Sequence, residues 1–155
     1  MRPRLAHAVA TLAALALAGA ANAQASASHT VAISIPALLR LRIDHHEASD
    51  HARVPIHVRV EGSRSEVEPA STLIEVLANT GWTLSARFEP EHDSDGIELR
   101  WQTDGGSGVL LASPSPVARG RATGGWRAIE VRYAVGGVPI DGAYRGVIAY
   151  TLARP

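Results

Sequence analysis

The sequence contains no cysteine and no lysine, and both absences limit what the chain can be. Small exported domains often depend on disulfides, so a cysteine-free chain has to be stabilised by one packed core. Its 155 residues are enough for a single core of this kind. All fifteen basic residues are arginine, which we interpret as a bias of the genome. They form no basic run interleaved with aromatic residues, which argues against a nucleic-acid partner.

Helical periodicity and long hydrophobic runs are also missing after residue 24. The 14 glycines and 9 prolines are spread too evenly along the chain for long helices. The N-terminal apolar run is shorter than the roughly 20 residues that a spanning helix needs, and no later run is longer. We therefore expect neither a helical fold nor an inserted membrane segment.

The first 23 residues have the pattern of a secretory signal peptide. Arg2 and Arg4 precede an Ala/Leu-rich run, which ends in a small-residue Ala-Asn-Ala triplet at 21–23. We predict cleavage after this triplet and a mature chain of residues 24–155. Loss of the two arginines leaves 13 arginines against 15 acidic residues. The mature protein is expected to be exported, whether to a periplasm, to the cell surface or to the medium.

Apolar and polar residues alternate with a period of two through most of the mature chain, which predicts strands with one buried face. The predicted strands are 31–35, 39–43, 54–60, 72–78, 82–88, 97–101, 129–135 and 148–152. Turn clusters rich in Gly, Asp and Ser separate them. This spacing predicts an all-β chain, in which residues 24–155 form a single domain, an antiparallel immunoglobulin-like sandwich of about seven to nine strands.

The least regular part of the chain is the segment 105–125. Pro114 and Pro116 discourage a central strand there, because proline cannot donate a hydrogen bond to a neighbouring strand. We predict a long loop with at most one short edge strand near residues 109–111.

Four of the seven histidines lie close together in the sequence: His45, His46, His51 and His57. Zinc or copper needs three or four imidazole or carboxylate ligands that converge on one ion. Strand phase places the last histidine on the outer face of its strand, so a metal site requires the loop 44–53 to fold over that face. The alternatives are a polar hairpin loop, whose histidines become charged together below about pH 6.5, and a pH-responsive contact.

No motif in the chain is typical of catalysis. The glycine clusters do not lead from a strand into a helix, as a phosphate-binding loop does. No serine lies in a nucleophile elbow, and the histidines fit no triad arrangement. We therefore predict a protein that is not an enzyme and has no catalytic residues and no cofactor, apart from the zinc or copper considered above.

Three tryptophans could form an aromatic platform for a sugar. Trp82 and Trp101 are in phase with the apolar residues of their strands, which predicts that both belong to the core. Trp126 follows two glycines and is the one we expect to be exposed and to contact a ligand or partner.

Two stretches carry a resemblance to the WxL domains of bacterial surfaces. Residues 79–84, Asn-Thr-Gly-Trp-Thr-Leu, resemble the first Trp-x-Leu signature of that family, and residues 142–155 resemble its closing segment. Trp82, Leu84 and Leu152 would hold signature positions, whereas Tyr150 stands where the second tryptophan is expected. The resemblance implies a β-rich, exported, non-catalytic domain that associates with the cell wall.

Residues 141–144, Asp-Gly-Ala-Tyr, are similar to the tyrosine corner of immunoglobulin-like sandwiches. In that motif a tyrosine hydroxyl bonds to backbone a few residues upstream and fixes the entry to a late strand. This similarity needs no ligand and favours the same architecture.

The expected function is that of a non-catalytic envelope or surface module, which binds a cell-wall polymer or an envelope protein. A first alternative is a periplasmic metal-binding protein that uses the histidine loop. A second alternative is a fimbria-like subunit that self-associates by strand exchange, because residues 24–35 have a polar lead followed by an alternating strand.

Overall fold

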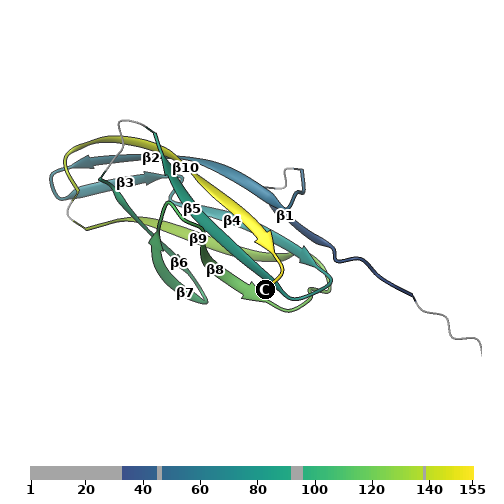
Figure 1. The fold of residues 1–155 in the computed structure, drawn as a ribbon. Coiled ribbons are helices and arrows are strands. Elements are labelled where there is room, and N and C mark those ends of the chain that lie inside the picture. Colours follow the sequence, from purple (N-terminus) through teal and green to yellow (C-terminus); the bar gives the residue numbers. More distant parts are fainter. Residues whose placement is uncertain (1–32, 45–46, 92–95, 138) are drawn as a thin grey trace, which may run out of the picture. The chain divides into compact units, whose positions relative to one another are not determined.

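The computed structural model describes residues 33–44, 47–91, 96–137 and 139–155 (Figure 1). The chain divides into two units, Met1–Ile35 and Pro36–Pro155. Of the first unit only residues 33–35 are described, and they form no strand. Ile33 and Ile35 are 80% and 76% exposed. The predicted strand at 31–35 is therefore wrong for the part of it that the structure describes.

The second unit is a sandwich of two antiparallel sheets with five strands each. The strands are β1 (Leu39–Ile43), β2 (His51–Glu61), β3 (Arg64–Glu68), β4 (Ser71–Ala78), β5 (Trp82–Pro90), β6 (Glu98–Thr103), β7 (Gly106–Leu110), β8 (Ser115–Gly120), β9 (Arg127–Gly136) and β10 (Gly142–Ala153). Sheet A has the order β1-β4-β9-β6-β7, and sheet B has the order β3-β2-β10-β5-β8. The all-β sandwich is confirmed, with ten strands in place of seven to nine.

The additional strands lie at sheet edges. β3 has the sequence RSEVE, in which Val67 is the one apolar residue, so it shows no apolar alternation. β8 contains Pro116, which the edge position tolerates because one side of the strand has no neighbour to bond. Its pairing with β5 shifts register between Leu84 and Ser85. The prediction of a loop without a strand at 115–120 was therefore wrong, because an edge strand can contain a proline. The short strand expected near residues 109–111 is present as β7.

The strands on either side of the histidine-rich stretch belong to different sheets. β1 pairs with β4 in sheet A, and β2 pairs with β10 and β3 in sheet B. A single bridge between Leu41 and Ser49 holds the connection to β1. The predicted hairpin between these two strands is therefore wrong, and the stretch crosses from one sheet to the other.

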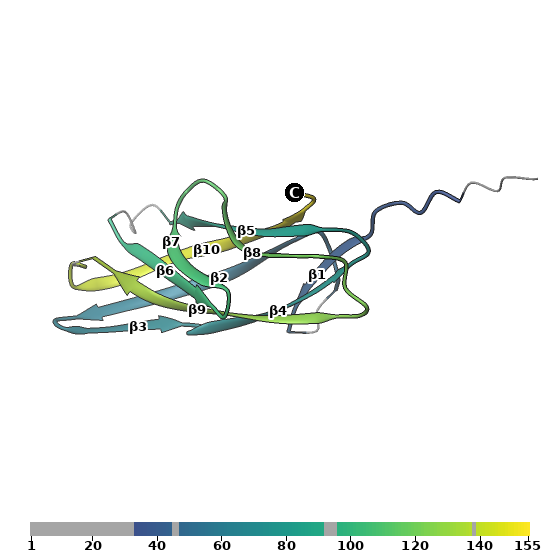
Figure 2. The same cartoon turned by 90° about the horizontal axis from the view of Figure 1, so that it is seen from below.

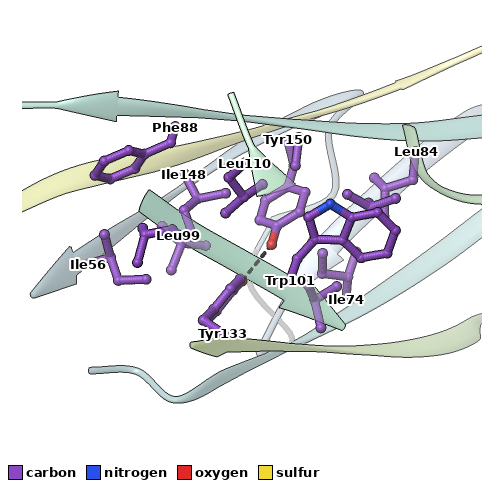
Figure 3. Packing of buried hydrophobic residues seen from close by; sticks show 14 of the residues in the cluster. Ile56, Ile74, Leu84, Phe88, Leu99, Trp101, Leu110, Tyr133, Ile148 and Tyr150 are labelled. Carbon is purple, nitrogen blue, oxygen red and sulfur yellow. Dashed lines mark hydrogen bonds between the residues drawn. The ribbon is translucent and has the colours of Figure 1, made fainter. Parts of the chain in front are cut away.

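The core lies between the inner faces of the two sheets, and it follows the predicted alternation (Figure 3). Along β2, buried residues alternate with exposed ones from Val54 to Val60. Trp82 and Trp101 are 1% and 8% exposed, which confirms that both are core residues. Burial of these apolar side chains provides the main stabilisation of a chain without disulfides.

A chain of hydroxyl groups connects the two sheets through the core. Tyr133 of β9 donates to Oγ1 of Thr72 at 2.8 Å and is itself hydrogen-bonded to Tyr150 of β10 (Figure 3). Since Tyr133 has a single proton to donate, Tyr150 is the donor between the two phenols. Burial raises the pKa of Tyr133 and raises that of Tyr150 well above its usual range. Both side chains therefore act as neutral structural bridges.

The tyrosine corner is present at the start of β10. The hydroxyl of Tyr144 donates to the backbone oxygen of Ile140 at 2.6 Å. This contact fixes the entry to the strand that pairs with both β2 and β5 at the centre of sheet B.

In the part of the chain that the structure describes, no helix is long and apolar enough to cross a membrane.

Candidate functional site

The described histidines of the 42–57 stretch do not converge. His51 begins β2, and its Nδ1 lies 2.8 Å from the carboxylate of Asp50 and 3.2 Å from the hydroxyl of Ser49. The hydrogen bond from His51 holds the pKa of Asp50 below its usual range. Both side chains are largely exposed, so this is a surface ion pair whose charge depends on the histidine.

His57 is in the middle of β2 and faces outward from sheet B, as strand phase predicted. Its cross-strand neighbours are Glu68 of β3 and Arg145 of β10. Five residues of extended strand lie between it and His51, and the six steps along the strand correspond to about 20 Å. These two histidines therefore cannot bind the same ion. His45 and His46 lie outside the described residues, and among the residues that the structure describes no group of three His, Asp or Glu side chains is placed to hold a metal.

Trp126 lies in the connection between β8 and β9 and is 37% exposed. The guanidinium of Arg42 lies over its ring, 4.2 Å from the ring centre, and also pairs with Glu75 at 2.7 Å. The arginine therefore covers one face of the indole. A contact of Trp126 with a ligand or partner stays a prediction.

A recess with a partly apolar lining forms a cleft between the two sheets on the β8 side of the sandwich. Its volume is about 590 Å³, and its lining comes from β8, the first half of β9 and the turn between β6 and β7. Figure 2 shows β8 and the beginning of β9 on the same side of the sandwich. The term "cleft" below refers to this recess.

Apolar core residues form part of the lining. Trp82, Trp101 and Val117 are buried and Ile129 is half-buried, and all four line the cleft. Nε1 of Trp82 donates to the backbone oxygen of Arg121 at 2.9 Å, which fixes the indole ring. The cleft thus gives access to the edge of the hydrophobic core.

Charged groups of both signs surround the apolar lining. Arg119 and Arg127 contribute two guanidinium groups, and Asp104 and Glu130 contribute two carboxylates. A hydrogen bond from Arg132 keeps the pKa of Glu130 below its usual range, so this carboxylate is charged at neutral pH. The described cleft lining contains no Ser, Cys or His.

The first half of β9 has an unpaired edge beside the cleft. Residues 127–132 pair with β4, and residues 132–136 pair with β6. The side of residues 127–131 that faces away from β4 therefore has no partner strand among the described residues. Unpaired backbone N–H and C=O groups of this kind are a template for an additional strand.

The other strand that borders the cleft is less suited to pairing. β8 contains Pro116, which lacks a backbone donor, and it has an irregular register with β5. Both are features that protect edge strands from unwanted partners. The corresponding residues of β9 include neither proline nor glycine. The cleft therefore combines an apolar lining with one good strand template.

Sequence reasoning did not find this cleft. The alternation at 129–135 predicted the strand, but not that its first half would lack a neighbour on one side. That property arises because β6 ends at Thr103 and turns back into β7 before it reaches this half of β9. The comparisons with known proteins add no assignment, since no family model, curated protein or solved structure matches the chain.

Proposed function

We propose that the chain is a non-catalytic module of the cell envelope, exported by its N-terminal leader, which binds a protein partner or a cell-wall polymer. The observation that carries the proposal is the unpaired edge of β9 beside the apolar cleft. A polypeptide in extended conformation is the ligand that suits this arrangement best. Its backbone would bond to β9, and every second side chain would enter the apolar lining.

The cleft's own chemistry favours binding over catalysis. Its charged groups are an exposed mixture of arginines and carboxylates, which suits the rim of a protein interface. The apolar groups lie at the centre, where a docked side chain would be removed from water. The binding energy would come from apolar contacts and backbone hydrogen bonds.

Peptide selection tests this function. The purified protein is panned against a random library of short peptides, and we expect enrichment of sequences with alternating Val or Ile. The cleft variant Ile129→Lys places a cation at the apolar lining and should lose the enriched peptides. The matched control is Ile43→Lys, because Ile43 and Ile129 are both half-buried and lie in one cross-strand row on either side of Ile74. Equal enrichment with both variants, or none with the wild type, would contradict the proposal.

Association with the cell wall is the second candidate, and the resemblance to WxL domains supports it. Among the described residues Trp126 is an exposed aromatic side chain, and the part of its indole that Arg42 does not cover would contact a sugar polymer. Sedimentation with intact peptidoglycan tests this candidate. We expect Trp126→Ala to reduce the bound fraction, and retention no greater than on bare beads would reject it.

The metal-binding alternative now depends on His45 and His46 acting together with His51 or with His57. Titration with Zn²⁺ or Cu²⁺ separates these combinations, because His57→Ala and His51→Ala cannot both weaken the same site.

The export step has its own test. Sequencing the N-terminus of the exported protein should give Gln24 as the first residue.

A further inference from the structure

We infer that the strand which the cleft accepts is the segment 29–35 of a second copy of this chain. The inference rests on the proposed function, because it names the partner that binds the same cleft. Each copy would then donate its N-terminal segment and accept that of another copy.

The donor segment has the chemistry that the cleft requires. In the sequence His-Thr-Val-Ala-Ile-Ser-Ile, the large apolar residues Val31, Ile33 and Ile35 alternate with small or polar ones. An extended strand with this sequence has one apolar face. The two isoleucines are among the most exposed large apolar side chains of the described chain. Burying both on the cleft lining would remove this apolar surface from water.

The lengths of donor and acceptor are compatible. Seven extended residues span about 23 Å, and the five residues 127–131 of β9 span about 17 Å. A strand beside this half of β9 would occupy the position in sheet A that β6 leaves empty after Thr103. Its apolar side chains would then lie over Ile129 and Trp101, which line the cleft.

The backbone just before β1 is fixed at a distance from the acceptor edge of β9. Asn79 holds the chain just before β1, because its side chain accepts from the backbone N–H of Leu38 at 2.7 Å and donates to the backbone oxygen of Pro36 at 2.8 Å. Asn79 follows β4, and a strand docked beyond β9 lies about two strand spacings away, or about 10 Å. Ile35 is only one residue, about 3.8 Å, from Pro36. The complete segment 29–35, with Ile35 docked, is therefore assigned to a second copy.

This arrangement is head-to-tail, since the donor and the acceptor are different surfaces of the chain. Such contacts form an open chain or a ring of copies, in contrast to a two-fold dimer in which one surface pairs with itself. Assembly should therefore increase with protein concentration and continue beyond two copies.

Analytical ultracentrifugation of the exported protein tests the inference. We expect concentration-dependent oligomers for the wild type and monomers for the double variant Ile33→Asp/Ile35→Asp. The matched control is Ile140→Asp, because this isoleucine is 79% exposed and lies in the connection between β9 and β10. Circular dichroism should show all three proteins folded. A wild type that stays monomeric at every concentration, or a double variant that assembles like the wild type, overturns the inference.

Cross-linking locates the contact, and the absence of native cysteines makes it specific. A Ser34→Cys copy is mixed with an Ala128→Cys copy and oxidised, and we expect a disulfide-linked heterodimer. The control partner is Glu66→Cys, on the exposed surface of β3 at the other edge of sheet B. Equal cross-linking to Glu66→Cys contradicts the proposed contact.

A synthetic peptide of residues 29–36 separates this inference from the proposed function. It should bind the monomeric double variant and lose binding when Ile129→Lys is added. If peptides from the random library bind the cleft and this peptide does not, the identity of the partner is wrong and the proposed function stands. If neither binds, the proposed function fails as well.

Discussion

The two edges of sheet B differ in how they close the sandwich. At one edge, β3 is a five-residue strand with Arg64, Glu66 and Glu68 exposed. The recess next to it has a volume of about 580 Å³ and is lined by polar and charged residues of β2, β3 and the turn between them. At the other edge, β8 borders the cleft of about 590 Å³ with its apolar lining. A short, charged edge strand discourages added strands, whereas an open apolar edge invites them.

The same difference is visible along β9 itself. In its second half the N–H of Tyr133 donates to the backbone oxygen of Ala70 at 2.9 Å, and β6 pairs on the other side. In its first half β4 is the one partner strand among the described residues. One strand thus has a covered half and a half that is available for binding. This contrast predicts that substitutions lower the free energy of unfolding more in the closed core than at the cleft.

The largest effect is expected from isoleucine truncation on the two sides of this contrast. Ile74 is fully buried and pairs across strands with Ile129, which is half-buried at the cleft. We expect Ile74→Ala to lower the free energy of unfolding by about 4 kcal/mol, because it leaves a closed cavity. Ile129→Ala should cost about 1–2 kcal/mol, because solvent can fill the space. Urea unfolding measures both, and equal costs would show that the cleft is closed in solution.

Adding a methyl group tests the same contrast in the opposite direction. A Cβ at Gly146 of β10 would lie 2.5 Å from the ring of Phe88 and 2.7 Å from the backbone oxygen of Glu89, so Gly146→Ala should cost about 3 kcal/mol. A Cβ at Gly120 of β8 would lie 2.4 Å from the ring of Trp82, which lines the cleft, so the ring would have to shift toward the cleft and lose its hydrogen bond to the backbone oxygen of Arg121. Gly120→Ala should therefore cost about 1–2 kcal/mol and shift tryptophan fluorescence to the red. A larger cost at Gly120 than at Gly146 would contradict this view.

Removing hydroxyl groups from the Tyr133–Tyr150 chain tests the closed core without involving the cleft. Tyr133→Phe removes the partner of both Thr72 and Tyr150 and should cost about 2 kcal/mol, whereas Tyr150→Phe leaves one bond intact and should cost about 1 kcal/mol. Because burial raises the pKa of both tyrosines above 10.0, their stabilisation is complete below pH 10 and is lost as the pH rises through the folded-state values. Denaturant unfolding below and above pH 10 should show a smaller decline for the Phe variants. If the stability of all three proteins fell equally above pH 10, the two tyrosines would not be the cause of the decline.

The smallest effect is expected on the outer surface of sheet B. A hydrogen bond from Arg53, with a further one from Arg87, keeps the pKa of Glu89 below 4.5. Its stabilisation is therefore present above pH 4.5 and is lost as the pH falls through the folded-state value. Glu89→Gln should reduce stability slightly at neutral pH and leave it unchanged in acid, as thermal unfolding can show. A loss of the same size at both pH values would rule out this charge effect. Solvent exposure makes this the smallest of the expected effects.

Much of the sandwich could be predicted from the sequence, because one-sided burial imposes a period of two on the long strands. The alternation predicted residues 54–60 of β2, 82–88 of β5 and 148–152 of β10, and it also placed Trp82 and Trp101 in the core. The edge strands β3 and β8 were missed, since an edge strand can carry charges or a proline and loses the signal.

The site was harder to predict because it depends on which strands are neighbours. The separation of His51 from His57 was missed, because the predicted strand began at residue 54 and left His51 in the loop 44–53, whereas β2 begins at His51. The crossing from sheet A to sheet B between β1 and β2 could not be predicted, because a hairpin and a crossover have the same local sequence signals. The open half of β9 likewise depends on where β6 ends, which is a property of three strands together.

Amide hydrogen exchange in β9 tests the central claim most directly. The exchange of residues 127–131 is measured in the Ile33→Asp/Ile35→Asp variant with and without the peptide of residues 29–36. The account predicts that amides on the side of these residues away from β4 become protected, while the amides of β3 keep their exchange rates. Unchanged exchange in residues 127–131 at saturating peptide, or equal protection in β3, would contradict the assignment of this edge as a strand acceptor.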